Sequence, residues 1–211
     1  MKQPYLNITK PQPPVLAQKI YKTVCWSVPK EQKTVYLTFD DGPVPKYTEW
    51  VLNVLEKYNV KATFFCVGEN VVKHREIFNL ILRQGHEVGS HTYNHLNGWK
   101  TFHSRYYYNV HKAARHIGSK LFRPPYGKIT IRQANHLSKD YKIIMWDIIC
   151  KDYDCSIDGE QCFKNVVDYV DNGSIIVFHD SEKAFKNLEY ALPKTIEYLQ
   201  EQGYVFEKLQ Q

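Results

Sequence analysis

Hydrophobic positions along the chain follow two alternating periods. Short apolar stretches typical of buried β-strands occupy residues 34–39, 62–67, 87–90, 121–123, 143–148, 174–178 and 204–207. The intervening segments place apolar side chains three or four positions apart, as amphipathic helices do, at residues 48–58, 71–83, 106–117, 131–139, 159–170 and 188–202. About seven strands that alternate with helices predict right-handed crossovers and one parallel sheet.

Two architectures accommodate such a sheet. Several predicted strands are continuous apolar runs, which is typical of strands covered on both faces. A closed or nearly closed α/β barrel has this property, and so does an open, doubly wound sheet. A Gly-rich nucleotide-binding loop after the first strand would favour the Rossmann form of the open sheet, and the sequence has none.

The first thirty residues differ from the rest of the chain. They contain Pro4, Pro11, Pro13, Pro14 and Pro29, and only the stretch at residues 15–24 is compatible with a short helix. Domains commonly hold about 150 residues, so the remainder fits a single domain. We therefore predict an irregular N-terminal extension at residues 1–30 and one domain at residues 31–211.

Composition narrows the class of protein. The 211 residues are 43% hydrophobic and 24% charged, which excludes a disordered or low-complexity chain. Strictly apolar runs are far shorter than the roughly 20 residues that cross a membrane, so we expect no stable membrane insertion. The net charge of +6 is not gathered into a basic block, so we expect no nucleic-acid partner. An ordinary solvated surface explains this charge, with an anionic glycan or membrane surface as the alternative. The oligomeric state is left open.

Cysteine usage and the N-terminal residues bear on location. Five cysteines cannot all pair within one chain, and none forms a C-x-x-C motif, so free thiols in a reducing compartment are expected. The apolar stretch at residues 15–17 ends at Gln18 and Lys19, too early for the core of a secretory signal. These features predict a cytoplasmic or membrane-peripheral protein. A leader preceding this sequence would instead place the protein outside the cytoplasm.

Ionisable residues follow five of the predicted strands. They are Asp40 and Asp41 after the first strand, His91 and His95 after the third, Arg123 after the fourth, Asp152 after the fifth and His179 after the sixth. Taken singly, each has an ordinary interpretation as a turn former, a capping residue or a solvated side chain. Because the C-terminal ends of the strands in a parallel barrel meet at one rim, we expect these side chains to form one site.

Four of these residues suggest a metal site. The adjacent carboxylates of Asp40 and Asp41 would repel each other in a buried mouth unless a cation lay beside them. One of them can bind a metal while the other acts as a base. On a helical turn, the spacing of His91 and His95 would place both imidazoles on one face. Two histidines, one carboxylate and an open position are the ligands of catalytic zinc, and also of non-haem iron oxygenases.

The remaining rim residues suggest groups that act beside a metal. Two prolines after Arg123 would fix its guanidinium and the backbone N–H of Tyr126. An arginine can orient a carboxylate base with a two-pronged hydrogen bond, and a preset N–H can stabilise an oxyanion. His179 would be a natural general acid near a metal, with Asp152 orienting its imidazole.

These residues resemble the motifs of the polysaccharide deacetylase family, which is built on the NodB homology domain and is also called carbohydrate esterase family 4. The resemblance runs from about residue 34 to residue 209. Five motifs occur in the family's order, namely Thr38-Phe39-Asp40-Asp41-Gly42-Pro43, His91 with His95, Arg123-Pro124-Pro125-Tyr126, Asp152-Tyr153 and Val177-Phe178-His179. The resemblance implies a distorted (β/α) barrel and a NodB-like catalytic domain at residues 31–211.

The resemblance also implies how one side of the site works. Asp41, His91 and His95 would hold a divalent metal ion, expected to be Zn²⁺, with Co²⁺ or Ni²⁺ as alternatives. Arg123 would hold the carboxylate of Asp40, the first aspartate of the motif, which would act as the base.

Other residues would complete the reaction and bind the substrate. By resemblance, His179 would be the acid, Asp152 would tune it, and the N–H of Tyr126 would form the oxyanion hole. Contacts with the substrate are expected from Tyr126, Tyr153 and Val177. Tyr153 and Val177 stand where the family usually has Trp and Leu, so the motifs specify the chemistry more closely than the substrate.

The implied activity is metal-dependent removal of N-acetyl groups from the N-acetylhexosamine residues of a peptidoglycan or chitin-like glycan, with release of acetate. An alternative substrate is a cytoplasmic or lipid-linked amino-sugar precursor. Two alternatives come from other classes of protein. A non-catalytic carbohydrate-binding relative would be expected to lack the base or the acid. An iron oxygenase would have no use for the pairs Asp40–Arg123 and Asp152–His179.

Overall fold

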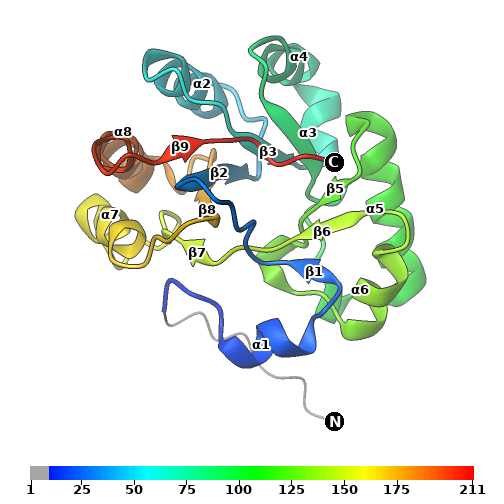
Figure 1. Ribbon diagram of the computed structural model, residues 1–211. Helices are drawn as coiled ribbons and strands as arrows, with labels where there is room; N and C mark the ends of the chain where they lie inside the picture. The colour runs from blue at the N-terminus through cyan, green and yellow to red at the C-terminus, as the bar shows by residue number, and fades with distance from the viewer. Residues whose placement is uncertain (1–9) are drawn as a thin grey trace.

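The computed structural model describes residues 10–211 as a curled β-sheet surrounded by helices (Figure 1). The strands are β1 Val24–Cys25, β2 Thr34–Asp40, β3 Thr63–Cys66, β4 Glu87–Ser90, β5 Leu121–Phe122, β6 Lys142–Ile144, β7 Ile148–Ile149, β8 Ser174–His179 and β9 Val205–Phe206. The α-helices are α1 Val15–Ile20, α2 Tyr47–Lys57, α3 Gly68–Lys73, α4 Arg75–Arg83, α5 His103–Ile117, α6 Ile131–Leu137, α7 Gly159–Val167 and α8 Phe185–Glu201. There are also two 3-10 helices, η1 Gly98–Lys100 and η2 Pro125–Gly127.

Hydrogen bonds join the strands in the order β1-β6-β5-β4-β3-β2-β8-β7, and β9 pairs with the beginning of β2. All of these pairings are parallel. No ladder joins the two end strands β1 and β7 within residues 10–211, so the barrel is open at that seam. The predicted distorted parallel barrel is confirmed, with nine strands where the apolar pattern predicted about seven.

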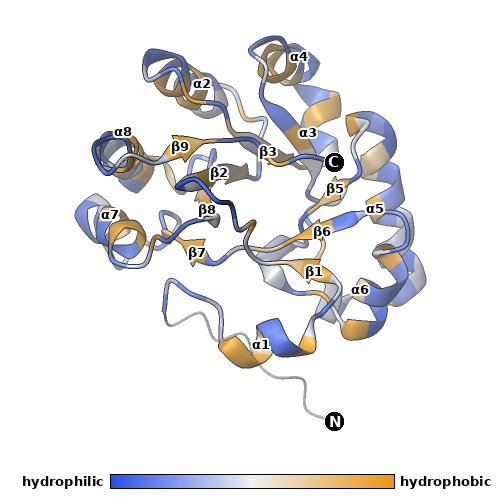
Figure 2. Ribbon diagram, viewed as in Figure 1, coloured by the Kyte–Doolittle hydropathy of each residue, from blue (hydrophilic) through white to orange (hydrophobic). Residues whose placement is uncertain are grey.

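Apolar side chains fill the space on both faces of the sheet. Along β2, Val35, Leu37 and Phe39 join a cluster with the surrounding helices. The alternate residue Tyr36 joins a second cluster together with Phe65, and this cluster also includes residues of α1, α5 and α6. Figure 2 shows apolar strands at the centre and polar residues on the outer surfaces of the helices. Burial on both faces explains why the strands read as continuous apolar runs.

The strand predicted at residues 143–148 is two strands, β6 and β7. The chain leaves the sheet after β6, the neighbour of the edge strand β1, and joins the opposite edge at β7. In between, Met145 N–H donates to the carbonyl of Cys25 in β1, and Asp147 N–H donates to the carbonyl of Ile175 in β8. This short segment crosses the open seam and connects its two sides.

The N-terminal segment has more structure than predicted. The short helix expected within residues 15–24 is present as α1. The prediction of an irregular extension is wrong for β1, which pairs Val24 with Ile143 and Cys25 with Ile144 at the edge of the sheet. Two residues are too few to give a strand period in the sequence, so only the pairing partner reveals this strand. The division of the chain at residue 30 stays a prediction, and residues 1–9 lie outside the described part.

The helix predicted at residues 71–83 is divided at His74 into α3 and α4. His74 has φ −125° and ψ 50°, outside the helical region, so the backbone turns there. Across residues 10–211, none of the helices has the length and apolar composition needed to cross a bilayer.

The barrel interior is tightly filled between β3 and β4. A Cβ added to Gly89 would lie 2.6 Å from two ring atoms of Phe65 and 3.1 Å from Cβ of Leu121. The guanidinium of Arg123 lies over the same ring, with its Cζ 4.1 Å from the ring centroid. Gly89 therefore leaves the room that the Phe65 ring needs to support a residue of the rim.

Replacing Gly89 with alanine should lower the free energy of unfolding by about 1–3 kcal/mol, the usual effect of overpacking a filled core. Urea denaturation measures this loss. The double variant Gly89→Ala/Phe65→Leu should lose less than the sum of the two single variants, because the smaller side chain removes the clash. Strictly additive losses would show that the Phe65 ring is not the obstacle.

Candidate active site

A cavity of about 460 Å³ opens at the C-terminal ends of the strands. Its walls are formed by Asp40, Asp41, His91, His95, Tyr126, Gly127, Lys128, Trp146, Ile149, Tyr153, His179 and Lys183. Pockets for small ligands commonly measure roughly 300–1,000 Å³. The structure thus brings together the ionisable residues that follow separate strands in the sequence, with Arg123 and Asp152 buried directly behind the wall.

The adjacent side chains of Asp40 and Asp41 have different partners. Asp40 ends β2, is 4% exposed, and accepts a hydrogen bond from Arg123 at 2.7 Å. Asp41 has a φ of 87°, in the left-handed region that L-residues rarely adopt. One of its carboxylate oxygens lies 3.1 Å from Nε2 of His95. Backbone strain of this kind persists only where the surroundings hold it, as at many functional sites.

Two side chains hold this turn from behind. Asn70 donates a hydrogen bond to the carbonyl of Asp41 at 2.8 Å. The buried carboxylate of Asp180 accepts from the N–H of Gly42 at 3.0 Å and from the hydroxyl of Thr48 at 2.5 Å. Burial raises the pKa of Asp180 to about 8. A Cβ added to Gly42 would lie 2.0 Å from this carboxylate, so only glycine fits. Asp180 was not identified from the sequence, although it directly follows the strand-end histidine.

His91 and His95 lie on a loop after β4, and not on the helical turn that their spacing predicted. Thr92 and His95 have φ values of 62° and 54°, which turn the backbone sharply. Asn109 of α5 holds the loop by accepting two of its backbone N–H groups at 2.7 and 3.3 Å. The two rings nonetheless lie side by side, with centroids 5.0 Å apart. The loop therefore achieves the pairing that the helical interpretation assumed.

Three possible ligand atoms converge in the pocket. One atom each from Asp41, His91 and His95 lie within 4.8 Å of one another. Oδ1 of Asp41 is 3.1 Å from Nε2 of His95 and 3.9 Å from Nε2 of His91. This oxygen is buried and lacks a well-oriented hydrogen-bond donor among the described residues. A buried carboxylate oxygen that faces two ring nitrogens suits a cation between them, so these residues fit a divalent metal.

Protonation states agree with this interpretation. Burial opposes ionisation of Asp41, but His95, His179 and His91 together hold the pKa of its carboxyl well below the usual range. Burial lowers the pKa of His91 to about 4. At neutral pH the site thus offers an ionised carboxylate and a neutral imidazole, the forms that bind metals.

Arg123 is completely buried behind the pocket. Its Nη1 donates to Oδ1 of Asp40 at 2.7 Å and to the hydroxyl of Thr38 at 2.8 Å. Its Nη2 donates to the carbonyl of Met145 at 3.0 Å. The expected two-pronged bond to the base is therefore a single bond, because the second nitrogen is engaged elsewhere. Burial lowers the pKa of Arg123, and the neighbouring charge of Asp40 opposes this shift.

Further hydrogen bonds orient the two imidazoles. Nδ1 of His91 lies 2.8 Å from the carbonyl oxygen of Arg123, which can only accept, so this nitrogen carries the proton. Nδ1 of His95 lies 3.1 Å from the hydroxyl of Tyr126. Partners at the far nitrogen fix the ring of a ligating histidine, and here they turn both Nε2 atoms toward Asp41.

His179 and Asp152 form a second buried pair. One oxygen of Asp152 lies 2.7 Å from Nδ1 of His179, and the other accepts the backbone N–H of His179 at 2.7 Å. Burial alone would lower the pKa of His179, but the carboxylate of Asp152, with smaller contributions from Asp41 and Asp40, outweighs it and raises this pKa to about 9. Asn187 holds the loop by donating to the carbonyl of Asp152 at 3.1 Å. At neutral pH the imidazole is therefore protonated.

The residues expected to touch the substrate do not all reach the pocket. Tyr126 is 53% exposed at the rim, and the ring of Tyr153 stands edge-on to His179 at 5.0 Å. Val177 is 1% exposed and lies in the second apolar cluster, not on the pocket wall. It precedes His179 by two residues, so it shares the same face of β8 one layer deeper. This position does not support the expected contact between Val177 and the substrate.

Several wall residues were not identified from the sequence. Trp146 packs so closely against Gly127 that an added Cβ would lie 2.6 Å from its ring. Trp146 lies in the segment that crosses the open seam, which the sequence did not reveal. Lys128 and Lys183 also line the pocket. Their positions next to the motifs of Tyr126 and His179 were the only signal available.

Comparisons with known proteins agree with the motif resemblance. Residues 27–142 match the family model described as polysaccharide deacetylase. A peptidoglycan-N-acetylglucosamine deacetylase of Bacillus cereus is 32% identical over 195 residues, which cover 87% of this chain and 89% of that protein. The peptidoglycan-N-acetylmuramic acid deacetylase PdaC of Bacillus subtilis is 30% identical over 227 residues, which cover 97% of this chain and 45% of that protein. Other curated relatives are also longer, since the chain spans 59% and 38% of two of them.

A solved structure shares the fold. It is the crystal structure of the Bc1960 peptidoglycan N-acetylglucosamine deacetylase in complex with 4-naphthalen-1-yl-N-oxidanyl-benzamide. The two structures superpose with a TM-score of 0.85 at 31% sequence identity, covering 91% of this chain and 94% of the other.

Replacing Asp152 with asparagine should lower the pKa of His179, because it removes the main interaction that raises it. In the unmodified protein the imidazolium persists until the pH rises through about 9; in the variant it should lose its proton at least one pH unit earlier, a large shift for a single neighbour. NMR titration of the ring measures this directly. The pKa of His86, which burial lowers to about 4, serves as the control and should not move. An unchanged titration of His179 would contradict the assigned role of Asp152.

Proposed function

The chain belongs to the polysaccharide deacetylase family, and on that premise we propose that it removes N-acetyl groups from the N-acetylhexosamine residues of peptidoglycan. Family membership makes the chain a deacetylase of N-acetylated glycans, and peptidoglycan as the substrate is our proposal. The observation that carries it is the presence of two buried pairs beside one candidate metal site, Asp40 with Arg123 and His179 with Asp152. Amide hydrolysis needs a base for the attacking water and an acid for the leaving amine, and these pairs supply both.

Asp40 acts as the base in this proposal. Its Oδ1 is held by Arg123 at 2.7 Å, and its Oδ2 is directed toward the candidate metal site, 4.0 Å from Nε2 of His91. The first oxygen thus fixes the carboxylate, and the second remains to accept a proton from water.

Asp41, His91 and His95 would hold the metal ion, which we propose to be Zn²⁺, with Co²⁺ or Ni²⁺ as alternatives. Two imidazoles and one carboxylate that leave a position open are typical of catalytic zinc. When bound, such an ion supplies a Lewis acid that polarises the acetamide carbonyl and acidifies water.

His179 acts as the acid. Asp152 holds Nδ1, which leaves Nε2 to serve the pocket, and the raised pKa keeps the ring protonated at neutral pH. The backbone N–H of Tyr126, whose φ of 60° presents this turn at the rim, would stabilise the developing oxyanion.

The complete step balances with these groups alone. The water oxygen forms a bond to the acetyl carbon, and its proton passes to Asp40. The bond between carbon and nitrogen then breaks as His179 gives its proton to the nitrogen. The immediate products are acetic acid and the free amine, and the acid then gives its proton to the amine. The proton held by Asp40 returns through solvent to His179, so acetate and an ammonium sugar leave and both residues are restored.

The rival interpretations explain less of the site. A non-catalytic carbohydrate-binding relative would not need both buried pairs, and an iron oxygenase would need neither. A lipid-linked amino-sugar precursor remains the alternative substrate. Acetate release from peptidoglycan glycan strands, compared with release from a lipid-linked N-acetylated monosaccharide, tests the proposed substrate. Faster turnover of the monosaccharide would overturn peptidoglycan as the substrate.

Removal of the metal by a chelator should abolish acetate release. Substitutions of the two adjacent aspartates should impair the protein in different ways. Asp40→Asn should keep the metal but lose about 10²–10⁴-fold in rate, the usual contribution of a general base. Asp41→Asn should lose the metal itself, because it removes a charged ligand. Metal content by mass spectrometry and acetate release are measured on the same preparations.

The reverse result would show that the two roles are exchanged. That result is an empty site in Asp40→Asn and a filled one in Asp41→Asn. Full activity in metal-free protein would contradict the mechanism altogether.

A further inference from the structure

Two lysines stand on different walls of the pocket, and the chemistry described above uses neither. Nζ of Lys128 lies 5.8 Å from the ring centroid of Tyr126 and 5.7 Å from that of Trp99. Nζ of Lys183 lies 5.6 Å from the ring centroid of Tyr153. Each of these walls therefore presents an ammonium group next to an aromatic ring.

The wall that carries Lys128 is held by several hydrogen bonds. The backbone N–H of Lys128 donates to the carbonyl of Pro125 at 3.0 Å, and its carbonyl accepts from the N–H of Gly98 at 2.9 Å. A Cβ added to Gly98 would lie 2.5 Å from that carbonyl oxygen. Trp99 is fixed in turn, because its Nε1 donates to the carbonyl of Ile129 at 3.0 Å. The backbone from which the Lys128 side chain extends is therefore fixed in position.

Neither ammonium group has a carboxylate within 4.0 Å across residues 10–211. The two aspartates of the pocket are already engaged, by Arg123 and by the histidines. The acid whose pKa responds to Lys183 is Asp154, and the hydrogen bonds from Ser156 are the main cause of its lowered pKa. These bonds, at 2.6 and 2.9 Å, occupy one oxygen of Asp154. The pocket therefore carries two cationic groups that remain free for a ligand.

The two lysines flank the reacting groups. Tyr126 contacts His95 through its hydroxyl, and Tyr153 stands against His179. Lys128 therefore lies on the side of the candidate metal site, and Lys183 on the side of the acid. A glycan whose acetamide lies between these histidines would extend past both ammonium groups.

Resting on the proposed function, we propose that Lys128 and Lys183 are carboxylate-binding residues that select acidic glycans. The sugars they favour carry a carboxylate, such as the lactyl ether of N-acetylmuramic acid, and neutral N-acetylglucosamine polymers lack it. A lysine ammonium recognises a carboxylate as a compact point charge. The adjacent aromatic rings offer apolar faces on which pyranose rings can pack. A peptide stem converts the lactyl carboxylate into an amide and brings carboxylates of its own, so peptide-free and peptide-bearing glycans separate the two sources.

Three substrates of equal sugar length test the proposal. They are a chitin tetramer, an alternating N-acetylglucosamine–N-acetylmuramic acid tetrasaccharide without peptide, and the same tetrasaccharide with peptide stems. Values of kcat/KM from acetate release are compared for the unmodified holoenzyme, Lys128→Gln, Lys183→Gln and the double variant. The measurement is repeated at rising salt concentration, because salt screens exposed charges.

The unmodified enzyme should prefer the acidic tetrasaccharides at low salt. Each lysine replacement should reduce kcat/KM on the peptide-free acidic tetrasaccharide roughly 1.5–5-fold, the effect of one exposed ion pair, and leave the chitin tetramer unchanged. Lys128→Arg and Lys183→Arg should retain the preference. A loss confined to the peptide-bearing substrate would assign the carboxylate to the stem. Equal losses on acidic and neutral substrates, or no preference in the unmodified enzyme, would overturn the proposal.

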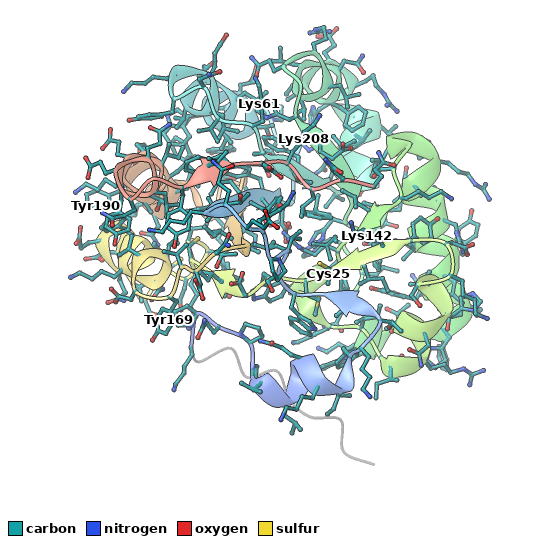
Figure 3. All side chains as sticks on the ribbon, in the orientation of Figure 1. Cys25, Lys61, Lys142, Tyr169, Tyr190 and Lys208 are labelled. Atoms are coloured by element: carbon teal, nitrogen blue, oxygen red, sulfur yellow. The ribbon has the colours of Figure 1, made fainter. Side chains whose placement is uncertain are left out.

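Lys194 provides a matched control. Its Nζ lies 4.4 Å from the ring centroid of Tyr190 in α8, the same kind of pair as those in the pocket. Tyr190 lies at the outer edge of the molecule, where α8 packs against the first residue of α7 (Figure 3). Lys194→Gln removes the same charge without touching the pocket, and it should change no rate.

A binding measurement separates this proposal from the proposed function. Dissociation constants of the tetrasaccharides are measured for Asp40→Asn, with and without the two lysine replacements. If no substrate releases acetate, the proposed function fails. A preference for the acidic tetrasaccharide that disappears with the lysines would still support the carboxylate subsites, and equal affinities would reject them.

Discussion

The hydrogen bonds of the buried Arg123 are the interactions on which both the base and the candidate metal site depend. Its side chain donates to Asp40 at 2.7 Å, and its backbone carbonyl accepts from Nδ1 of His91 at 2.8 Å. One residue thus positions the base and also orients a ring of the metal site. A buried charge that loses its partner destabilises a protein strongly, so Arg123 and Asp40 hold each other in place. Phe65 supports the guanidinium from inside the barrel, and Gly89 leaves the space for that ring.

This constraint separates two carboxylates that are adjacent in the chain. Asp40 ends a strand and is drawn to Arg123, whereas Asp41 turns away in a left-handed conformation toward His95. Asp180 stabilises that turn from a buried position. Because each carboxylate has its own cationic or imidazole neighbour, the two can take different roles, one as base and one as metal ligand. The same principle recurs at His179, where a buried carboxylate keeps an imidazole protonated at neutral pH.

The apolar pattern was sufficient to predict a parallel sheet, because its strands are buried on both faces and leave continuous apolar runs. It left a barrel and an open sheet as alternatives, and only the motif resemblance pointed to the barrel. It could not predict β1, which consists of two residues, or the division of β6 from β7, since crossing the open seam leaves no trace in hydrophobicity. The motifs predicted which side chains meet at the rim, because the ends of parallel strands meet there. They did not predict the loop that carries His91 and His95, which depends on a distant contact with Asn109. Val177 was placed wrongly because a motif position does not specify depth within the barrel, and the location in the cell stays a prediction.

The central claim is that Arg123 keeps Asp40 outside the coordination of the metal while Asp41 enters it. Anomalous diffraction from a crystal of the zinc-loaded protein tests this most directly. We expect one zinc peak about 2.0–2.2 Å from Nε2 of His91, Nε2 of His95 and an oxygen of Asp41, the usual distances for zinc. In that structure, Asp40 should remain hydrogen-bonded to Arg123. A zinc ion coordinated by Asp40, with its bond to Arg123 broken, would contradict the account.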